Sequence, residues 1–293
     1  DLCTVLSCLM VTLTNLQDDL QARMADKSGR FLVDADATRY LNIAYHDFVS
    51  KTEILLREWG FSVTANQFLY GAPSDMIKPG IMMWMQSSRR KLEYHPLSYF
   101  ADNGGLDLTS SGPANFFTWY EGDDKFRLWP TPSATSEATA INQVGGINTS
   151  VTTITVDDAS DLRDTGWVQI ENEKILYYAK SGNILQQCAR GMGGTTAATH
   201  SDDVAVSQID VHLWYYYQPA DLSSGSDTPE IPAPYHDNLV LGALYHALRS
   251  DGRDQEASVI FQEWTGAIAF ARGEAQKAQS SNYIAVNLAD GYE

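Results

Sequence analysis

Apolar residues recur every three or four positions in the first quarter of the chain, which is the spacing of one buried helix face. A first run at this spacing comprises Leu13, Leu16, Leu20 and Met24. A second and stronger run follows Asp36, a candidate helix cap, and comprises Tyr40, Leu41, Ala44, Tyr45, Phe48, Leu55 and Trp59. The pattern therefore predicts a helical hairpin at the start of the chain.

From Phe61 the pattern changes to short apolar runs separated by Gly and Pro, which is typical of β-strands joined by turns. The predicted strands are 61–63, 68–70, 81–85, 115–120 and 125–129. Pro130 and Pro132 close the last of them. These runs predict a layer of strands that follows the helical hairpin.

Residues 137–208 have a pattern of their own, with short strands and turns at close spacing. The candidate strands are 153–156, 167–170, 174–178 and 184–185, and the loop 190–196 consists largely of small residues. Such spacing predicts a small all-β module. Because the predicted strands 125–129 and 209–217 flank the module, we expect it to be inserted at a turn between two neighbouring strands.

The last third of the chain returns to helical spacing. Pro234, a residue that suits the first turn of a helix, precedes an apolar run from Leu239 to Ala247 that stops at 250–252. A second helix carries a stripe that alternates steps of four and three: Ala257, Phe261, Trp264, Ile268, Ala271, Ala275 and Ala278. The stripe tapers to alanines, so its far end can approach another helix closely.

The end of the chain, 280–293, is predicted to leave the helix as an extended tail. Ser280, Ser281 and Asn282 interrupt the helical pattern, and Ile284, Val286 and Leu288 then alternate with other residues as in a strand. We therefore expect this tail to pack poorly on its own domain.

Together these patterns predict an α+β fold. A helical core combines the N-terminal hairpin with the C-terminal helices, a β-strand layer joins them, and an all-β domain is inserted. We assign residues 1–136 and 209–279 to the core, 137–208 to the inserted domain and 280–293 to the tail.

Charge narrows the possible functions. The chain carries 20 Lys and Arg against 37 Asp and Glu, a net charge of −17, and no segment of it is basic. Tight binding to nucleic acid or to an anionic membrane requires clustered Lys and Arg, so both are disfavoured. Three cysteines without a Cys-x-x-Cys pair signal neither a disulfide framework nor a zinc site.

Candidate catalytic and metal-binding residues do not form a recognisable constellation. His236 and His246 lie ten residues apart, which is not the i, i+4 spacing of a helical metal site. The loop Gly191 to Thr196 is similar to a phosphate loop, but no Lys precedes its Thr pair and no helix follows, so a tight loop of the β-module is favoured. We therefore expect no enzyme activity, no cofactor and no metal site.

Two stretches resemble the head-to-tail adaptor proteins of tailed bacteriophages. One is Arg39 to Phe48 on an early helix. The other begins with the aromatic strand Leu213 to Tyr217, continues through a loop that ends in Ile231-Pro232, and enters a helix near Tyr235. The resemblance omits only 137–208, which is itself similar to small β units of other phage structural proteins.

The resemblance implies a virion structural protein at the neck of the particle, assembled in the host cytoplasm. It implies a dodecameric ring, about twelve copies, that lies beneath the portal, connects the capsid to the tail and continues the DNA channel. The implied partners are further copies of the chain, the portal protein, and a tail nozzle or tail tube protein, with tail fibres as a further candidate. DNA would pass through without specific binding, and no membrane is involved.

Two groups of site residues follow from the resemblance. The tapered stripe is expected to pack copies together in the ring, through Phe261, Trp264, Ile268, Ala271, Ala275 and Ala278. The tail is expected to dock on the portal by adding an extended segment to its surface, through Tyr283, Ile284, Val286, Leu288 and Tyr292.

Two other functions remain open from the sequence. A carbohydrate-binding or hydrolysing tail component would use exposed aromatics as stacking platforms, with Trp119, Tyr120, Trp129 and 214–217 as candidates. A hydrolase would also need a carboxylate pair, and the sequence does not single one out. The third hypothesis is a housekeeping protein of the host.

Overall fold

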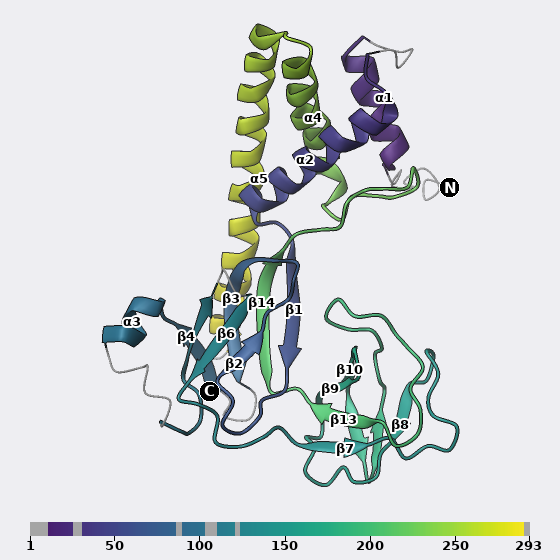
Figure 1. Cartoon of the computed structure of the whole chain (residues 1–293), viewed down its shortest axis with the longest axis vertical. Coiled ribbons are helices and arrows are strands. Elements are labelled where there is room, and N and C mark those ends of the chain that lie inside the picture. The colour runs from purple at the N-terminus through teal and green to yellow at the C-terminus, as the bar shows by residue number, and fades with distance from the viewer. Residues whose placement is uncertain (1–10, 26–30, 86–89, 103–109, 121–123, 290–293) are drawn as a thin grey trace. The chain divides into compact units, whose positions relative to one another are not determined.

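The computed structural model describes residues 11–25, 31–85, 90–102, 110–120 and 124–289. The chain divides into two compact units, a helical unit of residues 1–55 and 216–293 and a β unit of residues 56–215. Figure 1 labels the elements of both. Helices and sheets are both present, so the predicted α+β class is confirmed.

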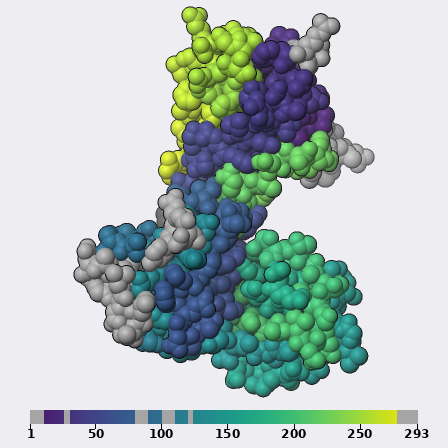
Figure 2. Space-filling view, viewed as in Figure 1, coloured from purple at the N-terminus to yellow at the C-terminus, as the bar shows by residue number. Residues whose placement is uncertain are grey.

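The helical unit contains the predicted N-terminal hairpin and two C-terminal helices. In the hairpin, the Gln17 side-chain amide donates to Thr38 Oγ1 at 2.7 Å. Figure 2 shows the yellow-green atoms of the C-terminal helices next to the purple atoms of the first helix. The helices of the unit are α1 (Leu13–Arg23), α2 (Asp34–Thr52), the 3-10 helix η2 (Ala233–Tyr235), α4 (His236–Ser250) and α5 (Asp254–Ala289).

Local backbone chemistry explains where these helices begin and end. Thr12 caps α1 by accepting a hydrogen bond from the N–H of Asn15. Helix α2 stops at Thr52 because Glu53 adopts the left-handed conformation, with φ at 57°. The predicted extension of this helix to Trp59 is therefore wrong, since Trp59 lies in the strand that follows.

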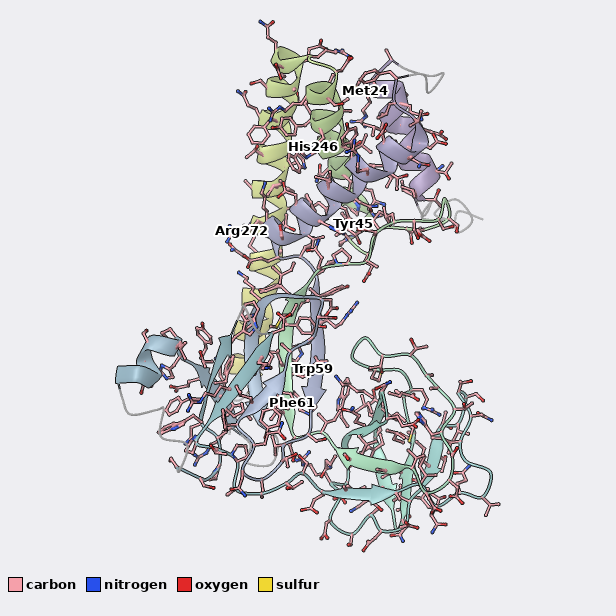
Figure 3. All side chains as sticks on the ribbon, viewed as in Figure 1. Met24, Tyr45, Trp59, Phe61, His246 and Arg272 are labelled. Carbon is pink, nitrogen blue, oxygen red and sulfur yellow. The ribbon has the colours of Figure 1, made fainter. Side chains whose placement is uncertain are left out.

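The core of the helical unit forms where α2, α4 and α5 pack together. Tyr45 of α2 is buried in this core, and its hydroxyl accepts a hydrogen bond from the N–H of Glu230 at 2.7 Å. Arg272 of α5 pairs with Glu53 at 3.4 Å (Figure 3). The end of α2 is thus tied to α5.

The β unit is built on a mixed sheet in the strand order β1-β14-β3-β4-β5-β6-β2. Strands β4 and β5 pair in parallel, whereas β3 with β4, β5 with β6 and β2 with β6 pair antiparallel. The bounds are β1 (Leu56–Phe61), β2 (Leu69–Gly71), β3 (Met76–Met85), β4 (Arg90–Tyr94), β5 (Phe116–Tyr120), β6 (Lys125–Trp129) and β14 (Val211–Tyr217), with the short helix α3 (Leu97–Asp102) between β4 and β5.

The β-module does not join neighbouring strands. It follows β6 and precedes β14, and β3, β4 and β5 lie between these two strands in the sheet. The expectation of an insertion at a simple turn is therefore wrong. Succession along the chain does not fix strand pairing, because pairing also depends on which faces the sheet buries. The module instead occupies a crossover connection.

The module has its own sheets and its own hydrophobic core. Its ends meet, since the N–H of Gln208 donates to the carbonyl of Glu137 at 2.7 Å. The strands are β7 (Ala138–Ala140), β8 (Thr153–Thr155), β9 (Gly166–Ile170), β10 (Glu173–Tyr177), β11 (Ala179–Ser181), β12 (Ile184–Gln186) and β13 (Ala205–Gln208). The core includes Ile141, Ile154, Val156, Val168, Ile170, Ile175, Tyr177, Leu185 and Val206.

Candidate functional site

The alternating stripe on α5 packs inside the helical unit. Trp264 is 2% exposed, and Ile268 and Ala271 are also buried. Gly242 of α4 leaves room for the indole, because a Cβ at this position would lie 2.7 Å from Trp264 Cε2 and 2.8 Å from the Cβ of Ala44 in α2. These side chains of the stripe are covered by their own chain, since the spacing that suits a partner helix also suits α4 and α2.

Other members of the stripe, and some of their neighbours on α5, lie at the surface. Phe261 is 42% exposed and Ala275 is half-buried, while the side chain of Ala278 is outside the described residues. Val259 and Phe270 are also exposed. Packing against another copy thus stays a prediction for the uncovered part of the helix.

The C-terminal segment is helical and not extended. Helix α5 continues to Ala289, so the interruption expected at residues 280–282 is wrong. Ser and Asn reduce helix stability by less than about 1 kcal/mol each, and neither Gly nor Pro occurs between Glu274 and Ala289. The docking candidates Tyr283, Ile284, Val286 and Leu288 lie in this helix, and Tyr292 lies outside the described residues.

A buried carboxylate, that of Glu173 in β10, holds the glycine-containing loop of the module. Arg190 Nε and Nη2 donate to its two oxygens, each at 2.7 Å. The N–H groups of Gly191 and Ala198 donate to the same carboxylate at 2.9 and 3.0 Å, and His200 Nε2 lies 2.8 Å from it. The loop singled out in the sequence therefore closes around one anionic side chain.

The electrostatics of this cluster keep Glu173 ionised. Burial by itself would raise the pKa of Glu173, but the hydrogen bonds from Arg190, the N–H of Ala198 and His200 outweigh burial and hold the pKa at about 2. Gly191 is required beside it, because its φ is 64° and a Cβ there would lie 2.8 Å from the N of Ala197. The hydrogen-bonded cluster around Glu173 thus stabilises the module.

A recess of about 310 Å³ lies where this loop meets strand β1. Arg57 and Trp59 come from β1, and Trp59 is labelled in Figure 3. Lys174 comes from β10 and Tyr215 from β14. Asp75 and the loop 193–195 also line the recess. Five separate parts of the chain therefore converge on one polar recess.

Most polar groups of the recess are satisfied by one another. Arg57 Nη1 lies 2.8 Å from Asp75 Oδ2, and the Tyr215 hydroxyl donates to Asp75 Oδ1 at 2.9 Å. Lys174 is only 5% exposed, and its Nζ lies 4.3 Å from the centre of the Trp59 ring. Burial lowers the pKa of Lys174 to about 7, against a smaller opposing effect of Asp75. Lys174 therefore stands apart in the recess, because its side chain is buried and burial favours its neutral form.

Two glycines allow the loop to approach β1 closely. Gly193 has φ at 61°, and a Cβ on it would lie 3.2 Å from the carbonyl oxygen of Glu58. Gly194 has φ at 79°, and its Cβ would lie 3.1 Å from Arg57 Cδ. Side chains at either position would be strained in this conformation and crowded against the strand. The glycines thus serve the contact between module and sheet.

Neither Glu173 nor Lys174 stands out as a functional residue in the sequence. Glu173 and Lys174 form a charged pair directly before the apolar run 175–178. A half-buried strand would instead alternate polar and apolar residues, so this pair is the one local signal for them. Trp59 continues a helical spacing in the sequence, so the local pattern does not predict its contact with Lys174. Contacts of this kind join segments that are distant in the sequence, whereas the spacing of apolar residues reports only on residues that are close in the sequence.

Three of the candidate sugar-stacking aromatics, Trp119, Trp129 and Trp214, are partly buried in the β unit. The ring of Trp129 stacks on Phe116 at a centroid distance of 5.8 Å. The indole nitrogens of Trp119 and Trp129 are buried. Trp214 is half-buried beside His212, with ring centroids 6.4 Å apart. None of these three indoles offers the fully open face that a sugar platform requires.

Within the described part of the chain, no three His, Cys, Asp or Glu side chains gather closely enough to hold a metal ion. No described helix combines the length and the apolar character needed to cross a membrane.

The structure is that of an α+β protein with a helical unit and a β unit, and the β unit includes a small β-module. Residues 11–287 match the family described as SU10 adaptor protein, and the chain belongs to this family. It is therefore a phage adaptor-type protein and a component of the virion. No curated protein matches the chain.

Proposed function

We propose that the protein is a head-to-tail adaptor, which forms a ring of about twelve copies beneath the portal and links the capsid to the tail. The observation that carries this proposal is the family match, which spans both units and the module, residues 11–287. The role is structural and involves no catalytic turnover. The ring would lie at the neck of the virion, after assembly in the host cytoplasm.

The charge of the chain supports a role as a DNA conduit. A net charge of −17 repels the phosphate backbone, so DNA can slide past without sticking. A ring that continued the portal channel would need this property. DNA is thus a passing partner and is not bound specifically.

Apolar surface on α5 supports contacts between copies. Val259, Phe261 and Phe270 are 57, 42 and 67% exposed on one helix of the helical unit. A closed ring uses a heterologous interface, in which two different faces of each copy meet. We assign the uncovered part of α5 to one of these faces.

The C-terminal part of α5 is our candidate for docking on the portal. The helix has 36 residues, whereas α4, which packs against it, has 15. Helix α5 is therefore too long for α4 to cover along its whole length. Ile284 and Leu288 are four residues apart, the spacing of one helix face, so the docking mode we propose is a helix in a groove.

The module and the tail-side partners complete the proposal. An inserted module would lie outside the ring, where it leaves the channel open. The partner on the other side would be a tail nozzle or tail tube protein, with tail fibres as a further candidate. Both assignments follow from the order of parts in an adaptor.

Electron microscopy tests the proposal directly. We expect the purified protein mixed with portal, and the necks of intact virions, to contain a ring of this chain with rotational symmetry. A protein present only as isolated protomers in intact virions would contradict the proposal. Binding to host polysaccharide with no ring would favour the carbohydrate-binding alternative.

A further inference from the structure

The recess between the module loop and β1 contains a cation whose hydrogen-bonding capacity is unused. Lys174 is more than nine-tenths buried, and its ammonium group has three donors. Among the described residues its Nζ finds no hydrogen-bond acceptor, and its nearest partner is the face of the Trp59 ring at 4.3 Å. The stem of Lys174 is thus buried, while its ammonium is free to bind a group that enters the recess.

The carboxylate of the recess does not bind this ammonium. The Asp75 carboxylate already pairs with Arg57 at 2.8 Å and accepts from the Tyr215 hydroxyl at 2.9 Å. Asp75 is therefore engaged by Arg57 and Tyr215, and it does not bind the ammonium of Lys174. The three side chains Arg57, Lys174 and Asp75 together carry a charge of about +1 when Lys174 is protonated.

We propose that this recess binds a single carboxylate, the side chain of an Asp or Glu residue from a neighbouring protein. The carboxylate would accept hydrogen bonds from Lys174 Nζ, and the stem of the acidic side chain would lie against Trp59. The volume of about 310 Å³ leaves room for such a side chain and part of its backbone. That the neighbour is another virion protein rests on the proposed function, whereas the carboxylate chemistry does not.

The charges favour a monoanion over a phosphate. A phosphate dianion would meet the Asp75 carboxylate across the recess, and this repulsion is strong where burial lowers the dielectric constant. A DNA backbone would also face a chain with a net charge of −17. A carboxylate instead neutralises the charge of Lys174.

The glycine loop keeps this recess open. Gly193 would place a Cβ 3.4 Å from Lys174 Cδ, and Gly194 would place one 3.1 Å from Arg57 Cδ. Side chains at these positions would crowd the two cations. Both glycines have positive φ, so the loop conformation itself excludes most other residues there.

A thermal-shift experiment with small anions tests the chemistry. Sodium acetate, sodium phosphate and sodium chloride are compared at matched ionic strength, on the full chain and on Lys174→Met. At about ten times its dissociation constant, acetate should raise the Tm of the wild-type chain by about 2–4 °C over chloride. The rise should vanish in Lys174→Met and persist in Lys125→Met, which removes an exposed lysine of β6.

Three results of the thermal-shift experiment would contradict carboxylate binding at Lys174. Equal stabilisation of Lys174→Met by acetate would overturn the proposal. So would a wild-type Tm that acetate leaves at the chloride value, or a larger shift with phosphate. A short DNA duplex that raises the Tm through Lys174 would replace the carboxylate by a phosphate backbone.

Carbodiimide cross-linking of intact virions then tests the partner. The reagent activates a carboxylate, and the amine of a contacting lysine attacks it to form an amide while a urea leaves. Mass spectrometry should find Lys174 joined to an Asp or Glu of another chain. A cross-link from Lys174 to Asp75 of the same chain, or no cross-link at Lys174, would contradict binding of a neighbouring protein's carboxylate. A symmetric ring without this cross-link refutes only this inference, whereas absence of the ring refutes the proposed function.

Discussion

Glu173 shows how much one buried carboxylate can organise. It receives hydrogen bonds from Arg190 and from the backbone of Gly191 and Ala198, so a single side chain fixes the course of the loop. A charge held in this way is stabilising only while its partners are complete, because each partner replaces lost water. The cluster is therefore sensitive to the removal of any one member.

Replacing Glu173 by Gln should strongly destabilise the module. Glu173→Gln keeps the size of the side chain but leaves Arg190 buried without its counter-ion, which we expect to lower the free energy of unfolding by about 3–5 kcal/mol. Urea denaturation measures this loss. The matched control is Glu171→Gln, at a side chain that is 58% exposed, with an expected loss below about 1 kcal/mol. Equal losses would contradict the buried-pair interpretation.

The same residue predicts how stability depends on pH. The pKa of Glu173 is about 2 in the fold against 4.5 as the reference value. A depressed carboxyl pKa stabilises the fold above the unfolded pKa, and this contribution is lost as pH falls through the folded pKa. The difference in unfolding free energy between wild type and Glu173→Gln should thus be constant near neutrality and shrink from about pH 5 to about pH 2. A difference that is flat to pH 2 would show that Glu173 is not held ionised.

At the scale of elements, close packing decides the helical unit. Helices α4 and α5 approach each other at Gly242, where Trp264 fills the space that a Cβ would occupy. This one contact covers the largest side chain of the α5 stripe. It also explains why a stripe that fits lateral packing between copies is used within the chain.

Replacing Gly242 by Ala should destabilise the helical unit although Ala is the better helix former. The added Cβ would meet Trp264 at 2.7 Å and Ala44 at 2.8 Å, and overpacking costs about 1–3 kcal/mol. Gly266→Ala on α5 is the control, because nothing lies within 4 Å of its Cβ position. It should stabilise by up to about 1 kcal/mol. Thermal unfolding of both variants measures the change in stability. A change of the same sign in Gly242→Ala and Gly266→Ala would contradict the close packing at Gly242.

The module should be removable as a unit. Its core is its own, and its ends are joined by the hydrogen bond between Gln208 and Glu137. A short Gly-Ser linker in place of 137–208 can therefore span the gap, and we expect the remaining chain to fold. Circular dichroism and gel filtration check this. An unfolded remainder would mean that contacts such as that of Ser62 with Gln208 are essential to the sheet.

At the scale of the whole molecule, the end of α5 governs attachment to the portal in our proposal. A chain truncated after Gln279 should stay soluble and folded, because it keeps Ala257, Trp264, Ile268 and Ala271, the buried residues through which α5 packs in the helical unit. It should no longer join purified portal rings, as judged by co-sedimentation and electron microscopy. Normal attachment of the truncated chain would remove the docking role.

Paired substitutions refine this test. The double variant Ile284→Ala with Leu288→Ala removes apolar side chains that share one helix face. The double variant Asn282→Ala with Asn287→Ala changes polar residues of the same helix and serves as the control. We expect loss of portal attachment in the first and none in the second.

The sequence by itself determined the parts that depend on near neighbours. Leucines at helical spacing predicted α1, and the strand 125–129 agrees with β6 because turn residues bound an apolar run on both sides. The α+β class and the tight loop at 190–196 follow from the same local signals. Local spacing reports which face of an element is apolar, and burial then fixes the element.

The tertiary structure alone decided what covers each face. It placed β3, β4 and β5 between β6 and β14, covered Trp264 with α4, and kept residues 280–289 in a helix. It also brought Lys174 to Trp59 across the recess. Spacing shows that a face is apolar but not which distant segment will meet it, because that choice depends on the packing of the whole chain.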